Sequence, residues 1–256
     1  MQIQEGHVLI QNTSLYYKKV APQNATNTIV LLHDSLGCTV LWRDWLDLLA
    51  QELNAIVVSY DRRGYGKSDN YTIPRPINYL EQEAEILDEL IQKLELKNVH
   101  LFGFSDGASV ATIYAGMFPN KIHSLTIEGV HVLLEETTLE GVRQAKKTLE
   151  TTQIAKVLEK YHGDKVMDLY LAWTETWLSE KHQSWNIEHF IPKIEVPILV
   201  IQGEFDEFGS AAQMDAFDVA PQVEKYWVIG AGHTAHKEKK DEVFERITSF
   251  IKQHLV

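Results

Sequence analysis

A serine in the first half of the chain stands where the backbone is expected to turn sharply. Residues 99–104 form an apolar, strand-like run, Gly103 and Gly107 flank Ser105, and the small residues 108–111 then open a helix. Small neighbours allow a strand to pass into a helix through a pinched turn, which presents the central hydroxyl above the sheet. We therefore take Ser105 as the candidate nucleophile.

A serine hydroxyl is a weak nucleophile without a base, and the base needs an acid that orients it. Candidate partners follow two later strand-like runs. Residues 197–202 lead to Asp206, and residues 223–229 lead through Gly-Ala-Gly to His233. Nucleophile, acid and base then occur in the chain order that a strand–elbow–helix scaffold uses. We expect Ser105, Asp206 and His233 to form a catalytic triad.

Neighbouring residues offer alternatives for both partners. His236 follows His233 by three residues and is expected instead to open the last helix. The Gly-x-Gly sequence before His233 favours His233 as the base. Three carboxylates compete with Asp206 for the acid's role: Glu128, Glu204 and Glu207.

Negative charge that develops on a substrate oxygen needs backbone N–H donors, and the loss of one donor costs about 3–4 kcal/mol in the chemical step. One expected donor is the N–H of Asp106, directly after the nucleophile. The other is expected from the loop of residues 33–37, where we assign the N–H of Ser35. The carboxylates of Asp34 and Asp106 would flank this site. We therefore expect an acidic mouth that disfavours anionic substrates.

Strand-like and helical patterns alternate along the chain. The expected strands cover residues 7–11, 14–20, 28–33, 55–60, 99–104, 123–130, 196–202 and 223–229. Helical spacing of apolar residues is found over residues 40–53, 79–94, 106–117 and 241–254. This alternation predicts the α/β class, with a mostly parallel sheet between layers of helices and a ligand site at the carboxyl ends of the strands.

One segment interrupts the alternation. Residues 131–191 show three helical patterns and no convincing strand, and they follow the sixth expected strand. We expect a helical cap here, over a core domain made of residues 1–130 and 192–256. The cap aromatics Tyr170, Trp173, Trp177 and Trp185 are candidates for an apolar pocket. The predicted substrate contacts are Asp34, Trp42, His131, Trp173 and Trp177.

Composition narrows the function classes. The 256 residues carry a formal net charge of −12, which disfavours binding to nucleic acid or to an anionic membrane surface. The first residues lack the pattern of a signal peptide, and the apolar runs are too short to span a bilayer. A single cysteine, Cys38, cannot form an internal disulfide. We expect a cytoplasmic protein and leave its oligomeric state open.

Two other patterns suggest cofactors but fail on spacing. Gly66-Lys67-Ser68 is similar to the end of a phosphate-binding loop, but position 61, where its first glycine would stand, is Asp61. The 11 histidines include no His-Glu-x-x-His pair and no Cys/His cluster. We expect neither a metal nor another cofactor.

Taken together, these motifs resemble those of the α/β-hydrolase fold serine hydrolases over essentially the whole chain. The matching segments are residues 33–37, 61–69, 103–107, 203–206 and 230–233. The resemblance implies the nucleophile at Ser105, the acid at Asp206 and the base at His233. The chain departs from the family pattern at Asp34, where glycine is usual. The family's aminopeptidases usually carry Gly-Gly-Ser-Trp-Gly, which differs from Gly-Phe-Ser-Asp-Gly here.

The expected activity is a two-step acyl transfer to water, acting on small or medium neutral carboxylic esters or lactones. Two alternatives remain open, because one fold hosts several functions. The same residues suit a C–C bond hydrolase or a lyase. A protein of this kind can also serve as a ligand receptor with little turnover.

Overall fold

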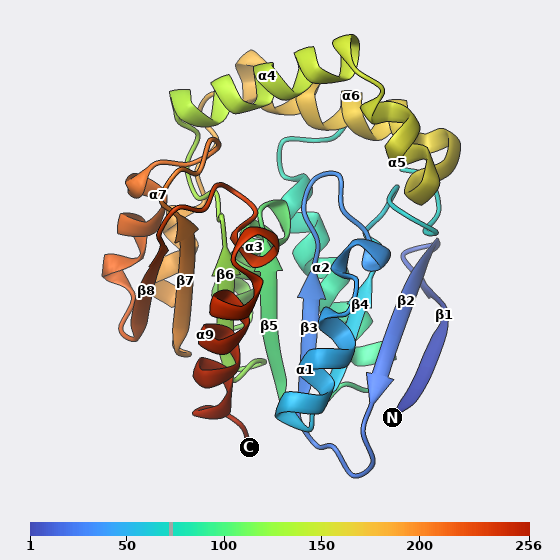
Figure 1. Cartoon of the computed structure of the whole chain (residues 1–256), viewed down its shortest axis with the longest axis vertical. Coiled ribbons are helices and arrows are strands. Elements are labelled where there is room, and N and C mark those ends of the chain that lie inside the picture. Colours follow the sequence, from blue (N-terminus) through green and yellow to red (C-terminus); the bar gives the residue numbers. More distant parts are fainter. Residues whose placement is uncertain (72–73) are drawn as a thin grey trace.

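A computed structural model describes residues 1–71 and 74–256. The strands of this part form one eight-stranded sheet in the order β1-β2-β4-β3-β5-β6-β7-β8 (Figure 1). Their bounds are β1 Gln2–Ile10, β2 Thr13–Ala21, β3 Thr28–Leu32, β4 Ile56–Tyr60, β5 Val99–Phe104, β6 Ser124–Glu128, β7 Ile198–Gly203 and β8 Val223–Val228. Strand β2 pairs antiparallel with β1 and β4, whereas β3 to β8 run parallel. The predicted α/β fold with a mostly parallel sheet is confirmed.

The buried strands explain the continuous apolar runs in the sequence. Every residue of β3, β5, β6 and β7 is buried, because helices cover both faces of the sheet. Strand β1 lies at one edge, and most of its residues are exposed or half-buried. Parallel strands place their carboxyl ends at one edge of the sheet. That edge is where Ser105, Asp206 and His233 follow their strands.

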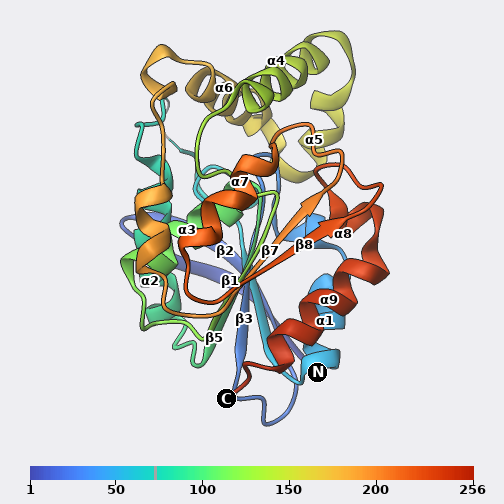
Figure 2. The same ribbon diagram turned by 90° about the vertical axis from the view of Figure 1, so that its left-hand side faces the viewer.

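Helices form a layer on each face. Helices α1 (Trp45–Leu53) and α9 (Lys240–Lys252) cover one face, and α2 (Tyr79–Lys93) and α3 (Asp106–Met117) cover the other (Figure 2). Each layer forms its own apolar core against the sheet. Helix α3 is buried along almost its whole length because it lies between the sheet and α2. None of the described helices is long and apolar enough to cross a membrane.

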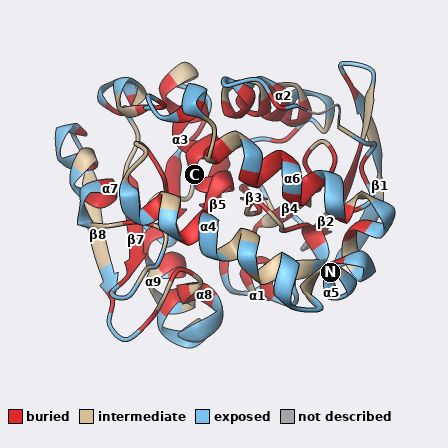
Figure 3. Cartoon of the chain, turned by 90° about the horizontal axis from the view of Figure 1, so that it is seen from above, coloured by how far each residue is buried: buried red, intermediate tan, exposed pale blue. Residues whose placement is uncertain are grey.

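The segment between β6 and β7 lies above the carboxyl edge of the sheet (Figure 1). It contains α4 (Glu136–Thr151), α5 (Ile154–His162) and α6 (Val166–Trp177), all within the expected cap of residues 131–191. From above, α4 and α5 show many exposed residues, whereas the strands beneath them are buried (Figure 3). Two short helices, α7 (Ala211–Asp215) and α8 (Ala235–Glu238), follow β7 and β8.

Two predicted helices differ from the structure. The helix expected over residues 40–53 is a 3₁₀ turn, Thr39–Trp42, followed by α1. The break falls at Arg43, whose φ of 52° is incompatible with a continuous helix and whose N–H closes the turn on the carbonyl of Val40. His236 lies in the separate helix α8 and does not open α9.

Candidate active site

Ser105 lies in a strained turn between β5 and α3. Its φ of 54° and ψ of −122° are outside the regions that non-glycine residues usually adopt. The two flanking glycines make the turn possible. A Cβ at Gly107 would lie 2.2 Å from the carbonyl oxygen of Leu32, and a Cβ at Gly103 would lie 2.4 Å from the carbonyl oxygen of Gly107. The backbones of β3, β5 and α3 meet here without space for a methyl group.

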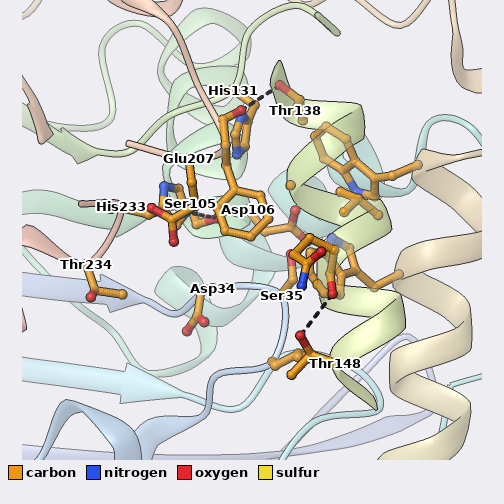
Figure 4. Close-up of a pocket in the computed structure, with 18 of the residues that line it drawn as sticks. Asp34, Ser35, Ser105, Asp106, His131, Thr138, Thr148, Glu207, His233 and Thr234 are labelled. Carbon is orange, nitrogen blue, oxygen red and sulfur yellow. Dashed lines mark hydrogen bonds between the residues drawn. The ribbon is translucent and has the colours of Figure 1, made fainter. Parts of the chain in front are cut away.

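The structure brings the three expected triad residues together. The Nε2 atom of His233 is 3.0 Å from Oγ of Ser105 (Figure 4). The Nδ1 atom of His233 is 2.9 Å from Oδ1 of Asp206. With the Nδ1–H donated to Asp206, Nε2 is free to accept the serine proton. This is the geometry that activates a hydroxyl for attack on a carbonyl.

The competing residues are engaged elsewhere. The carboxylates of Glu204 and Glu207 accept the backbone N–H groups of Gly230 and His233. Glu128 bonds to His236, and not to the ring of His233. Each of these groups orders the loops around the site.

The electrostatics of Asp206 and His233 fit an acid–base pair. Burial alone would raise the pKa of the Asp206 carboxyl, but its contacts with His233 and the N–H of Phe208 outweigh burial and lower that pKa. Burial would likewise lower the pKa of His233. The charge of Asp206 and its hydrogen bond, with smaller contributions from Glu207 and Glu128, raise that pKa instead.

Two residues with backbone N–H donors line the same cavity as Ser105. Ser35 and Asp106 both line the cavity above Ser105, and in the described part of the chain neither of their N–H groups has a hydrogen-bond acceptor. The N–H of Asp106 is also the first of helix α3, where an oxyanion is favoured by the unpaired amides. These two N–H groups are therefore the candidate donors for an oxyanion site.

The carboxylate of Asp106 contributes little to the expected acidic mouth. It is 1% exposed, lies 3.5 Å from Nη2 of Arg62 and accepts the hydroxyl proton of Tyr79 at 3.2 Å. Tyr79 in turn accepts the indole N–H of Trp177 from the cap at 3.0 Å. The negative charge of Asp106 is therefore compensated beneath the cavity by a buried guanidinium.

The side chain of Asp34, unlike that of Asp106, is not buried beneath the cavity. It lines the cavity and is half-buried, and its Oδ1 atom would lie 2.0 Å from a Cβ at Gly37, so the side chain folds back over its own loop. Its backbone oxygen accepts hydrogen bonds from Arg62 and His33. The loop that carries Ser35 is thus anchored through Asp34 to the residues after β4.

A cavity of about 580 Å³ lies between the sheet edge and the cap. This volume is within the range of small-molecule sites. The charged side chains that line it are Asp34, Asp106, Glu140 and Glu207, and none of the described lining residues is a lysine or an arginine. The wall is otherwise largely apolar and aromatic, with Phe104, Val142, Tyr170, Trp173, Trp177 and Phe208.

His131 forms part of the wall beside the base. Its ring stacks on that of His233 at 5.7 Å between centroids and meets Trp177 edge-on at 5.3 Å. Burial and the charge of His233 lower the pKa of His131 to about 4. The cavity therefore contains, beside His233, the imidazole of His131, which is neutral at neutral pH.

The cap is tied to the loop that carries Asp206. Glu135 accepts hydrogen bonds from the N–H and the hydroxyl of Ser210, at 2.7 and 2.6 Å. The Thr138 hydroxyl donates to the carbonyl of Phe208 at 2.7 Å. These bonds hold the start of α4 against the acid's loop.

Of the five predicted substrate contacts, four line the cavity: Asp34, His131, Trp173 and Trp177. The prediction for Trp42 is wrong. Trp42 is 3% exposed and packs on Phe102 and His236, because it lies in the apolar core on the α1 and α9 face of the sheet. The candidate Trp185 also lies outside the wall and packs on Trp177 and His182.

Sequence reasoning missed one face of α4. The residues of α4 that line the cavity are Thr138, Glu140, Gly141, Val142, Gln144, Ala145 and Thr148. Their spacing is helical, so the periodicity of this segment carried the signal. Phe208 was also missed. It lies two residues after Asp206, and its ring lies 4.8 Å from that of His233.

The chain is similar in sequence to known hydrolases. Residues 27–187 match the family model for the α/β hydrolase fold, and residues 178–252 match that of an α/β hydrolase domain. Serine hydrolase BPHL of Mus musculus is 30% identical over 217 residues, which cover 80% of this chain and 71% of that protein. The human protein is 31% identical over 159 residues, and that match spans only about half (53%) of its length.

Two further proteins are similar over nearly the full chain. The proline iminopeptidase of Lactobacillus helveticus is 24% identical, with 99% of each chain covered. The crystal structure of the enol-lactonase from Burkholderia xenovorans LB400 superimposes with a TM-score of 0.77 at 18% identity, covering 96% of this chain and 99% of that one. The family match spans more than half of the chain, and these likenesses agree with it. The chain belongs to the α/β-hydrolase fold family of serine hydrolases.

Proposed function

We propose that this hydrolase cleaves small or medium neutral carboxylic esters or lactones through an acyl-enzyme on Ser105. The observation that carries the proposal is the continuous link from Oγ of Ser105 through His233 to Asp206, at the floor of a cavity with two unengaged N–H groups. Such a link supplies nucleophile, base and orienting acid in one place.

The proposed reaction has two halves. His233 removes the Ser105 proton as the hydroxyl oxygen attacks the carbonyl carbon, and the N–H groups of Ser35 and Asp106 stabilise the oxyanion. The protonated His233 then gives its proton to the leaving alcohol, and the acyl group stays on Ser105. Water, deprotonated by the same base, attacks the acyl carbon. The bond to Oγ of Ser105 breaks, the acid is released, and His233 returns its proton to Oγ. The chain's own residues complete this cycle.

Size and charge of the cavity define the proposed substrate class. A volume of about 580 Å³ under residues 131–191, which we propose act as a cap, limits the substrate to a small or medium molecule. Asp34, Glu140 and Glu207 repel an anionic acyl or alkyl group, and no cation lines the described wall. His131, Trp173 and Trp177 are the proposed contacts of its polar and apolar parts. We place this activity in the cytoplasm, in keeping with the single cysteine.

The likeness to proline iminopeptidases supports a second candidate, the hydrolysis of an N-terminal aminoacyl amide. The carboxylates of the wall suit the ammonium group of such a substrate. The apolar cavity and the likeness in fold to an enol-lactonase fit the ester and lactone class.

The decisive test combines active-site labelling with a substrate panel. A fluorophosphonate should label the wild-type protein and Ser249→Ala, an exposed serine of α9, but not Ser105→Ala. Hydrolysis of p-nitrophenyl esters and lactones should exceed that of prolyl p-nitroanilide and of a vinylogous diketone. An anionic ester should react more slowly than its neutral isostere. Retained esterase activity in folded Ser105→Ala would refute the mechanism. A wild-type protein that is not labelled would contradict an activated Ser105 and favour the receptor alternative.

A further inference from the structure

A second carboxyl–imidazole pair lies beside the Asp206–His233 pair. Oε1 of Glu128 is 2.8 Å from Nδ1 of His236 and also accepts the backbone N–H of His236 at 2.9 Å. Both residues are buried, with exposures of 0% and 2%. The proposed mechanism does not use this pair, although it lies three residues from the base.

Glu128 contacts both the segment that carries the nucleophile and the segment that carries the base. It is the last residue of β6, pairs with Phe104 of β5, and accepts the backbone N–H of Ser105 on its carbonyl oxygen at 2.9 Å. Its carboxyl group holds the first turn of α8, directly after His233. Ser105 and His233 are 128 residues apart in the chain, and Glu128 bonds to the backbone of one and to the segment next to the other.

The rings around this junction leave little freedom. The Phe104 ring packs against both imidazoles, with centroids 5.1 Å from His233 and 4.6 Å from His236. The ring of His236 also packs against the rings of Trp42 and Trp45, with centroid distances of 5.4 Å and 5.9 Å. Movement of the α8 turn would therefore be transmitted to the ring of His233.

The pair is also costly for the fold. Burial of a carboxyl group is unfavourable unless it is fully hydrogen-bonded, and apolar residues of similar size often stabilise a protein more. Oε2 of Glu128 is buried, and within the described residues it has no partner. A simple packing role would be filled at lower cost by an apolar side chain.

We propose that Glu128 is a positioning residue, which holds Nε2 of His233 within bonding distance of Oγ of Ser105 through its bonds to Ser105 and His236. This inference rests on the proposed function, because it assumes that His233 is the base for Ser105. A displacement of a reacting group by about 1 Å can cost on the order of a hundredfold in rate. Glu128 acts through the position of His233 and does not contact the substrate cavity.

The test compares two substitutions with a matched control. Glu128→Leu removes the acceptor for His236 and should lower kcat by about tenfold or more with KM nearly unchanged, because positioning affects the chemical step. Fluorophosphonate labelling of Ser105 should slow by the same factor. Glu128→Gln keeps an oxygen acceptor and should restore most of this loss. Glu83→Leu is the control, since Glu83 is a buried carboxylate that pairs with Arg63 and also has one oxygen without a partner.

The pH profile gives a readout that a purely structural role would not move. The titratable groups around His233 are Asp206, Glu207, Glu238, His131, Glu128 and His236. Glu128→Gln removes one negative charge from this set, so the acid limb of kcat/KM should move to lower pH. The same limb should not move in Glu83→Leu.

The outcomes are separable. The inference is overturned if folded Glu128→Leu is labelled at the wild-type rate, or if Glu83→Leu loses as much kcat as Glu128→Leu. If Glu128→Leu does not fold, an unshifted acid limb in Glu128→Gln overturns it. A wild-type protein that resists labelling would instead contradict the proposed function itself.

Discussion

Substitution of Gly107 by alanine is the most direct probe of how the elbow is built. The new Cβ would lie 2.2 Å from the carbonyl oxygen of Leu32 and 2.7 Å from that of His33. An ordinary contact begins at 3.4 Å, so the end of β3 and the loop after it would have to move by about 1.2 Å. That loop carries the N–H of Ser35, and the movement would take this donor away from the oxyanion position.

Two separate losses are expected for Gly107→Ala. Overpacking of a buried site costs about 1–3 kcal/mol of folding free energy. Displacement of one oxyanion donor costs about 3–4 kcal/mol in the chemical step, which lowers kcat by roughly 10²- to 10³-fold. Gly6→Ala is a suitable control, because the nearest atoms to its Cβ belong to the side chain of Tyr17, at an ordinary contact distance of 3.4 Å.

The two losses are measured separately, by urea unfolding and by ester hydrolysis at a temperature where the variant is folded. We expect Gly6→Ala to keep wild-type kcat. A Gly107→Ala protein with full kcat would refute the assignment of the loop donor. A protein with normal stability would refute the close backbone contact.

Three further predictions concern buried ionisable side chains. Asp206→Asn should lower kcat by about 10⁴-fold and move the acid limb of kcat/KM to lower pH, because Asp206 raises the pKa of His233. Arg62→Leu should destabilise the fold by about 3–5 kcal/mol in urea unfolding, since the buried carboxylate of Asp106 loses its cation; Asp106→Asn in the same chain should recover part of this loss. His182, whose pKa is lowered to about 4 by burial, should make the wild type less stable at pH 4 than at pH 7. In the unfolded chain the imidazole binds a proton below its ordinary pKa of 6.5, whereas in the folded protein it stays neutral down to about pH 4. The free energy of unfolding should therefore decrease by up to ~3 kcal/mol as the pH falls from 6.5 to 4. His182→Phe should make this decrease smaller.

The parts of the site that could be predicted are local in the sequence. The glycines around Ser105 and those before His233 mark turns that only small residues allow, and each turn follows an apolar strand. Parallel strands bring their carboxyl ends to one edge. The convergence of Ser105, Asp206 and His233 therefore follows from topology and needs no knowledge of individual side-chain contacts.

The orientation of side chains near the site could not be predicted in the same way. Trp42 was among the expected substrate contacts, and it lies in the run 40–53, which shows helical spacing. A positive φ at Arg43 ends that run, and no residue-type preference of arginine indicates it. Asp106 illustrates the same limit, because its partner Arg62 is distant in sequence. The two residues meet only when β4 pairs within the sheet and α3 packs on it.

Arg62 also explains how the two proposed oxyanion donors keep a fixed separation. Its Nη2 atom donates to the backbone oxygen of Asp34 at 2.9 Å and lies 3.5 Å from the carboxylate of Asp106. Asp34 precedes Ser35, whereas Asp106 carries the other N–H itself. One buried guanidinium thus connects the loop after β3 with the start of α3. Because that contact neutralises Asp106, the acidity of the cavity comes from Asp34, Glu140 and Glu207, and selectivity against anionic substrates should depend on these three residues.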